Sequence, residues 1–165
     1  MRVRARRIMF LAVLAALPAV QQAPAQTAPP ANPPPPEFRA GLGDLMTMWV
    51  QPRHIKLGLA GQAGNWSYAA YELHEMQEAF QKVARYVPQW RSMPVAEMLP
   101  ALTKVPLAAM ERAIQAQDAA RFAAAYEQLT EGCNQCHQAA DRGMIVIRGP
   151  TGNPFPDQDF RPRAP

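Results

Sequence analysis

Two thiols and one imidazole lie within a single five-residue segment, Cys133-Asn134-Gln135-Cys136-His137. On a helix, Cys133 and Cys136 share one face, because residues three apart are neighbours. Thiols at this spacing can form thioethers with the two vinyl groups of one porphyrin, and the histidine that follows can bind the iron. The segment therefore predicts one covalently attached haem c, with His137 as the proximal iron ligand.

The same cysteine pair allows two other interpretations, a disulfide or a thiol-redox or zinc site. Cys133 and Cys136 are the two cysteines of the chain. A structural disulfide normally closes a longer loop, and a redox pair usually opens a helix that follows a strand. Here the pair lies near the end of a helical pattern, which favours haem attachment. No paired carboxylates or acid–base set accompany it, so enzymatic turnover is not predicted.

Residues 1–25 have the pattern of a secretory signal peptide. Four arginines open the chain, at Arg2, Arg4, Arg6 and Arg7, and the apolar run Ile8–Val20 follows. This run is shorter than the roughly 20 residues that span a bilayer. Ala23-Pro24-Ala25 offers a cleavage site, so we expect export to the periplasm and cleavage near Ala25. We favour the general secretory route over the twin-arginine route, because haem attachment needs accessible cysteines in an unfolded chain.

The formal charge of +4 comes from 17 basic and 13 acidic residues. The four arginines of the signal peptide account for the whole excess, so the rest of the chain is neutral. A neutral domain lacks the electrostatic basis for binding nucleic acid. The expected partners are instead redox partner proteins in the periplasm and the cytochrome c maturation machinery.

Composition divides the remaining chain into three parts. Residues 26–36 form a proline-rich tether, for which an extended polyproline II conformation is expected. Residues 37–143 carry helical periodicity and form the folded domain. Residues 144–165 are rich in Pro, Asp and Arg and are expected to be irregular.

Apolar spacing predicts four helices, over about 38–61, 65–87, 92–117 and 118–143. Asn65 and Asp118 are the expected N-caps of the second and fourth helices, and Gly143 is expected to end the fourth. Pro52 predicts a kink in the first helix, whereas Pro100 and Pro106 leave the third as one helix or two short pieces. Short connections between amphipathic helices predict an all-α, antiparallel four-helix bundle.

A single Cys-x-x-Cys-His on the last of four helices resembles the class II c-type cytochromes, the cytochrome c′ group and its low-spin relatives. The resemblance covers about residues 38–142. It implies a haem within the bundle near the end of the fourth helix, and it allows a homodimer through the first two helices. The chain departs from the family at Pro52, at the two prolines of the third helix and in the tail beyond Gly143.

Helix packing places the candidates for the sixth iron ligand on the first helix. In an antiparallel bundle the start of this helix faces the haem-bearing end of the fourth, at the level of Met46, Met48 and Trp49. Met46 and Met48 point about 160° apart, so only one can face the iron. Met46 shares the apolar stripe, whereas Met48 matches the distal helix of the resembling family. His54 lies farther along, between Arg53 and Lys56, and is either a third candidate or a solvated surface residue.

The sixth ligand separates two functions. A Met or His ligand favours electron transfer, because a six-coordinate iron reorganises little when its charge changes. An open sixth position walled by apolar side chains instead favours binding of NO or CO, as the family resemblance implies. Arg53, Lys56 and Arg142 are the candidate partners for the haem propionates.

Overall fold

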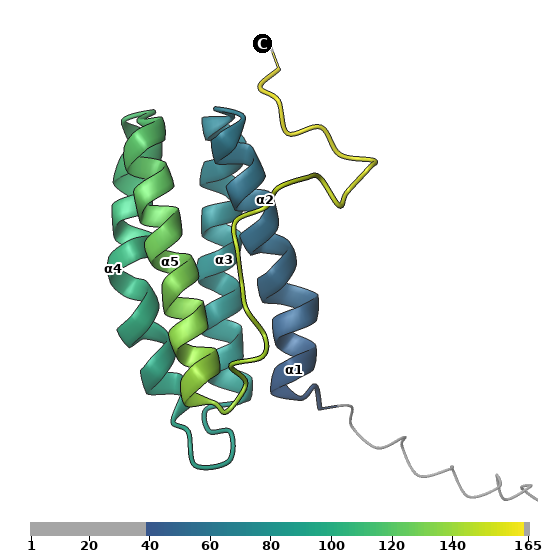
Figure 1. Ribbon diagram of the computed structural model, residues 1–165, viewed down its shortest axis with the longest axis vertical. Helices are drawn as coiled ribbons and strands as arrows, with labels where there is room; N and C mark the ends of the chain where they lie inside the picture. Colours follow the sequence, from purple (N-terminus) through teal and green to yellow (C-terminus); the bar gives the residue numbers. More distant parts are fainter. Residues whose placement is uncertain (1–38, 164–165) are drawn as a thin grey trace, which may run out of the picture. The chain divides into compact units, whose positions relative to one another are not determined.

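The computed structural model describes residues 39–163 (Figure 1). The expected signal peptide 1–25 and tether 26–36 lie outside the described residues. The described part belongs to one compact unit. It is all-helical and contains no strand, which confirms the all-α prediction and is consistent with a helical bundle. Within it, no helix is long and apolar enough to cross a membrane.

The first helical stretch changes its hydrogen-bond pattern just before Pro52. Helix α1 covers Leu42–Leu45, the π-helix η1 covers Met46–Val50 and helix α2 covers Gln51–Gln62. The backbone N–H of Gln51 bonds to the carbonyl of Met46, five residues back. Pro52 is the second residue of α2, directly after this π-helical turn, and it has no N–H to offer the preceding turn. The sequence predicted a kink at Pro52, and the structure has one π-turn directly before it.

Helix α3 covers Trp66–Tyr86 and matches its prediction closely. The side chain of Asn65 accepts a hydrogen bond from the N–H of Tyr68 at 3.2 Å, which confirms Asn65 as the N-cap. The helix ends before Pro88, because the residue that precedes a proline avoids the helical conformation. Its buried face includes Leu73, Met76 and Phe80.

Helix α4 is one continuous helix, Val95–Gln115, with both prolines inside it. Each proline removes one helical N–H, at a cost that tertiary packing must offset. Pro106 is itself buried, and Leu99, Leu107 and Met110 of the same helix lie in the core. Burial of this face therefore maintains the helix through two residues that would divide it in isolation.

Helix α5 covers Ala119–Ala139, and Asp118 caps it by accepting from the N–H of Arg121 at 2.9 Å. The prediction that Gly143 ends this helix is wrong. Asp141 takes the left-handed conformation, with φ of 55°, and the N–H of Arg142 bonds to the carbonyl of His137 at 2.7 Å. This is the Schellman motif that terminates helices, and aspartate is among the residues that tolerate it. The motif turns the chain back directly after His137.

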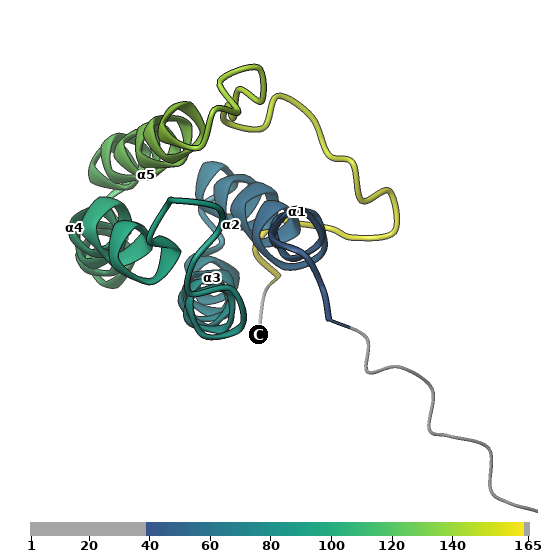
Figure 2. The same ribbon diagram turned by 90° about the horizontal axis from the view of Figure 1, so that it is seen from below.

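The long helices pack around one core (Figure 2). Helix α2 contacts α3 and α5, and α4 contacts α3 and α5. The start of α1 and the end of α5 lie at the same end of the bundle (Figure 1). Fully buried apolar side chains come from every long helix: Leu57, Met76, Val83, Val95, Met110 and Leu129.

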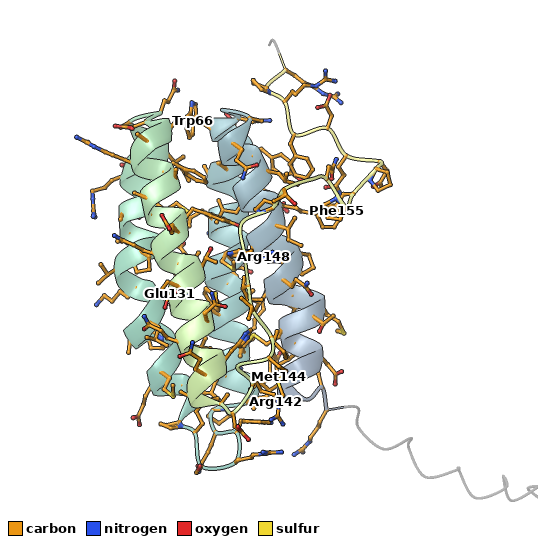
Figure 3. The ribbon with its side chains drawn as sticks, in the orientation of Figure 1. Trp66, Glu131, Arg142, Met144, Arg148 and Phe155 are labelled. Carbon is orange, nitrogen blue, oxygen red and sulfur yellow. The ribbon has the colours of Figure 1, made fainter. Side chains whose placement is uncertain are left out.

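The tail after α5 has no helix or strand through residue 163, yet it follows the surface of the bundle. Phe160 is buried, and its ring stacks on that of Tyr68 with centroids 5.3 Å apart. The amide of Gln62 donates to the carbonyl of Pro150. Figure 3 shows the tail passing from Met144 near the end of α5, past Arg148, to Phe155 beside α2.

Candidate functional site

A cavity of about 260 Å³ lies at the end of the bundle where α1 begins and α5 ends. A single water needs only about 10–15 Å³, so this space far exceeds an ordinary packing defect. Apolar side chains from α1, η1, α3, α4, the loop before α4 and the tail form most of its wall: Leu42, Val50, Phe80, Trp90, Met93, Leu99, Leu102, Ile145 and Ile147. The space therefore suits a large, mostly apolar ligand.

The three residues of the Cys-x-x-Cys-His segment that carry chemistry all line this cavity. Cys133, Cys136 and His137 lie in the last turns of α5. Burial raises the pKa of the Cys133 thiol to about 12, with Cys136 as a smaller cause, and burial also raises the pKa of Cys136. Both groups are therefore neutral thiols at neutral pH.

The imidazole of His137 is oriented by the tail. Its Nδ1 lies 2.8 Å from the backbone carbonyl oxygen of Ile145. A carbonyl can only accept, so Nδ1 carries the proton and donates it. In the neutral imidazole, Nε2 is then the nitrogen whose lone pair can bind a metal.

Of the two methionine candidates for the sixth iron ligand, Met46 lines the cavity and Met48 does not. Met48 is 52% exposed, as expected for two residues that point to nearly opposite sides of one helix. Trp49 also lies outside the lining, and its ring packs 6.0 Å from that of Tyr86. Met46 belongs to η1, and π-helical turns occur often at functional sites. The arrangement favours Met46 over Met48 as a side chain that faces His137.

His54 is buried, not solvated: only 3% of it is exposed, and it lines the same cavity. Its Nε2 lies 2.9 Å from Thr130 Oγ1, and its Nδ1 lies 3.0 Å from the hydroxyl of Tyr126. Burial lowers the pKa of His54 from 6.5 to about 4. Both ring nitrogens are thus engaged, so His54 would have to break one of these bonds to bind a metal.

Among the candidate cations, Arg142 alone lines the cavity. Arg53 of α2 pairs with Glu75 of α3 at 3.1 Å, and the Lys56 ammonium lies over the ring of Phe155. His74, the remaining histidine of the chain, is exposed and lies 3.3 Å from Glu78.

Trp90 lines the cavity, and two guanidinium groups lie near its indole ring. Arg91 lies 4.6 Å and Arg142 5.0 Å from the centroid of its indole ring. Reciprocal backbone hydrogen bonds between Trp90 and Met93 hold the turn that presents Arg91. Neither arginine forms an ion pair with a carboxylate of residues 39–163. Sequence reasoning missed Arg91, although its position next to a tryptophan in a proline-flanked loop was a usable signal.

Sequence reasoning also missed the polar partners of the two histidines. Tyr126 and Thr130 follow the apolar spacing of α5 and gave no sign of a hydrogen-bonded cluster. Ile145 and Ile147 contribute backbone atoms to the site, which no side-chain pattern reveals.

Residues 39–163 hold no group of three or more His, Cys, Asp or Glu side chains that would bind a metal ion by themselves. Comparison with protein-family models, with curated proteins and with solved structures found no match to this chain.

Proposed function

We propose that this chain is an exported c-type cytochrome with one covalently attached haem, built on an antiparallel four-helix bundle, and that it transfers electrons. One observation carries the proposal. Cys133, Cys136 and His137 open onto the same apolar cavity, and the Nδ1 atom of His137 is already engaged by a backbone carbonyl. The two thiols, the apolar cavity and the Nε2 atom of His137 therefore lie together at one site.

The thiols fit attachment better than redox exchange. Reactive Cys-x-x-Cys pairs have a lowered thiol pKa, because a helix N-terminus or a nearby cation stabilises the thiolate. Here the pair lies at the other end of its helix, and burial raises both pKa values. A neutral, half-buried pair facing an apolar space is suited to thioether formation with two vinyl groups.

The pair of arginines at Trp90 fits the charged edge of a haem. Haem carries two propionates, which need cationic or polar partners. Arg91 and Arg142 extend from different elements to one indole ring that lines the cavity. We infer that these two guanidinium groups hold the propionates, while the apolar wall surrounds the macrocycle and excludes water.

The bound haem would supply one-electron redox chemistry, and the protein sets its ligation, exposure and potential. His137 would provide the proximal nitrogen and Met46 is the favoured sixth ligand. Met48 and His54 rank below it, because Met48 is largely exposed and both nitrogens of His54 are engaged. Ligation by Met46 favours electron transfer.

A second function, binding of NO or CO, is favoured by the state of His54. Its two hydrogen bonds keep the imidazole away from a sixth position, and the remaining wall is mostly apolar. If Met46 does not bind the iron, this wall encloses an open site suited to a small apolar gas.

The proposed location and partners follow from the sequence. We infer export to the periplasm with cleavage near Ala25, haem insertion by the cytochrome c maturation machinery, and exchange of electrons with periplasmic redox proteins. A homodimer is compatible with the family resemblance. N-terminal sequencing and intact mass of the exported protein test cleavage, and a product that retains residues 1–25 in the membrane fraction contradicts it.

The decisive experiment is expression of the full chain together with cytochrome c maturation machinery. We expect a haem-stained band on a denaturing gel and the absorption spectrum of a thioether-bound haem in both redox states. The matched control is Cys133→Ala with Cys136→Ala, which should lose the band. Removal of all haem from the wild type by acid–acetone would contradict covalent attachment. A low-spin spectrum supports electron transfer, whereas a high-spin spectrum with rapid CO binding to the reduced protein supports gas binding.

A further inference from the structure

Asn134 is the second residue of the Cys-x-x-Cys-His segment 133–137, called here the attachment segment. Its side chain holds the C-terminal tail. The backbone N–H of Ile147 donates to Asn134 Oδ1 at 2.8 Å, and Asn134 Nδ2 donates to the Ile147 carbonyl at 3.0 Å. A side-chain amide thus pairs with one tail residue in both directions, as two strands pair. The neighbouring Gln135 makes no such contact, since its amide lies 3.5 Å from Glu131 on the same helix.

Between α5 and this clamp, the tail passes the imidazole of His137. After the left-handed residue Asp141, the N–H of Ile145 bonds to the carbonyl of Arg142 at 2.8 Å. This turn directs the Ile145 carbonyl at His137 Nδ1. The turn lies between α5 and Asn134's partner Ile147, so both ends of the segment that holds the carbonyl are fixed to one helix.

The tail is also fixed along the rest of its length. The side-chain amide of Asn65 donates to the Arg161 carbonyl, and Phe160 is buried against Tyr68. Figure 3 shows Met144, Arg148 and Phe155 spaced along this path from the cavity end of the bundle toward the end that carries Trp66. The tail is therefore a docked element, although Met144 is 77% exposed.

We propose that the C-terminal tail is the positioning element for the proximal ligand, with Asn134 as its clamp and the Ile145 carbonyl as the acceptor for His137. The proposal rests on the proposed haem function. A hydrogen bond at Nδ1 fixes the tautomer and orientation of an iron-binding imidazole and raises its basicity. A more basic ligand stabilises ferric over ferrous iron, so the docked tail holds the reduction potential down.

The test compares Asn134→Ala with Gln135→Ala, both inside the attachment segment and both in the haem-loaded full chain. We expect Asn134→Ala to raise the reduction potential and to speed trypsin cleavage after Arg148, seen as loss of residues 149–165 by intact mass. Gln135→Ala should match the wild type in both. Equal potentials for the two variants would overturn the proposal, and so would equal cleavage rates.

A measurement on the wild type covers the case in which Asn134→Ala yields no haem-loaded protein. The His137 Nδ1 proton should exchange slowly with solvent in the reduced protein, as followed by NMR. Exchange as fast as that of a free imidazole would overturn the positioning role. If the wild type binds no haem at all, the proposed function has failed and not the tail proposal alone.

Discussion

The phenol of Tyr126 and the imidazole of His54 form one buried unit that joins α5 to α2. The Tyr126 hydroxyl lies 3.0 Å from His54 Nδ1 and 2.8 Å from the His54 carbonyl oxygen. The Thr130 hydroxyl donates to the Tyr126 carbonyl at 2.8 Å, so it accepts from His54 Nε2. In the neutral imidazole the proton is therefore on Nε2, and the single phenol proton of Tyr126 is shared between the His54 carbonyl oxygen, at the shorter distance, and Nδ1. Every polar atom of this cluster has a partner, which is the condition for burying it.

This cluster predicts a loss of stability in acid. His54 has a pKa of about 4 in the folded protein and 6.5 in the unfolded chain. Between these two pH values the imidazole is protonated in the unfolded chain and neutral in the folded protein. The full stabilisation is present above pH 6.5 and is lost as the pH falls toward 4. A pKa difference of this size is worth on the order of 3 kcal/mol. Urea unfolding at a series of pH values between 7.5 and 4 measures it.

The control for the acid prediction is His74→Asn, which removes an exposed histidine and leaves the buried His54 cluster intact, so the loss of stability in acid should remain. His54→Asn should be less stable than the wild type at pH 7.5, because two buried hydrogen bonds are lost or weakened. It should also show a flatter dependence on pH. An equally steep curve in His54→Asn would assign the acid sensitivity to other groups.

The second prediction concerns the sixth ligand. Met46→Ala should convert a low-spin haem spectrum to high-spin and remove the weak charge-transfer band of Met/His ligation, because Met46 faces the cavity. Met48→Ala is the matched control, two residues away but 52% exposed. It should leave the spectrum unchanged. Spectra of both oxidised proteins at one pH make the comparison.

His54→Ala distinguishes the remaining alternative. If His54 binds iron, this change, and not Met46→Ala, produces the high-spin spectrum. A wild type that is already high-spin, with no response to any of the three changes, would rule out electron transfer through a six-coordinate haem and favour gas binding.

Helix positions could largely be predicted from the sequence, because apolar spacing and the caps Asn65 and Asp118 are local signals. The end of α5 could not, since an aspartate took the left-handed position for which a glycine two residues later was expected. The continuity of α4 through Pro100 and Pro106 depends on burial against other helices. Local helix propensities do not include this tertiary contribution.

The candidate site divides in the same way. That Cys133, Cys136 and His137 line one cavity agrees with their helical spacing, and the opposite directions of Met46 and Met48 follow from helix geometry. The burial of His54 depends on Tyr126 and Thr130, more than 70 residues away. The role of the tail depends on backbone carbonyls, which every sequence has at every position. Long-range polar pairing is therefore what sequence reasoning missed.

The third prediction concerns the two arginines near Trp90. Arg142→Gln removes a positive charge near the proposed haem. Because that charge destabilises ferric iron more than ferrous iron, its removal should lower the reduction potential. A shift of tens of millivolts is expected, given that about 59 mV corresponds to a tenfold change for one electron. Arg91→Gln should act in the same direction. Arg148→Gln is the control, since Arg148 is exposed and is not part of the cavity wall. A lowered potential in the control as well would assign the effect to net charge.

The last prediction concerns the contact between α4 and α5 beside the attachment segment. A Cβ atom placed on Gly132 would lie 2.9 Å from the carbonyl oxygen of Leu102. Pro106 has no N–H to offer that carbonyl, so the close approach of the two backbones uses a glycine next to Cys133. Gly132→Ala should therefore force the helices apart and destabilise the protein by about 1–3 kcal/mol, the usual cost of overpacking.

Gly152→Ala is the matched control, because nothing lies within 4 Å of a Cβ atom there and Gly152 is not part of the cavity wall. Gly152 is an exposed residue of the tail, so this change should leave stability unchanged. Urea unfolding of both haem-loaded variants measures the difference. Because Leu102 and Gly132 both line the cavity, Gly132→Ala should also lower the yield of haem-loaded protein. A stable Gly132→Ala with normal haem content would show that the two helices separate easily and that the cavity does not depend on their close contact.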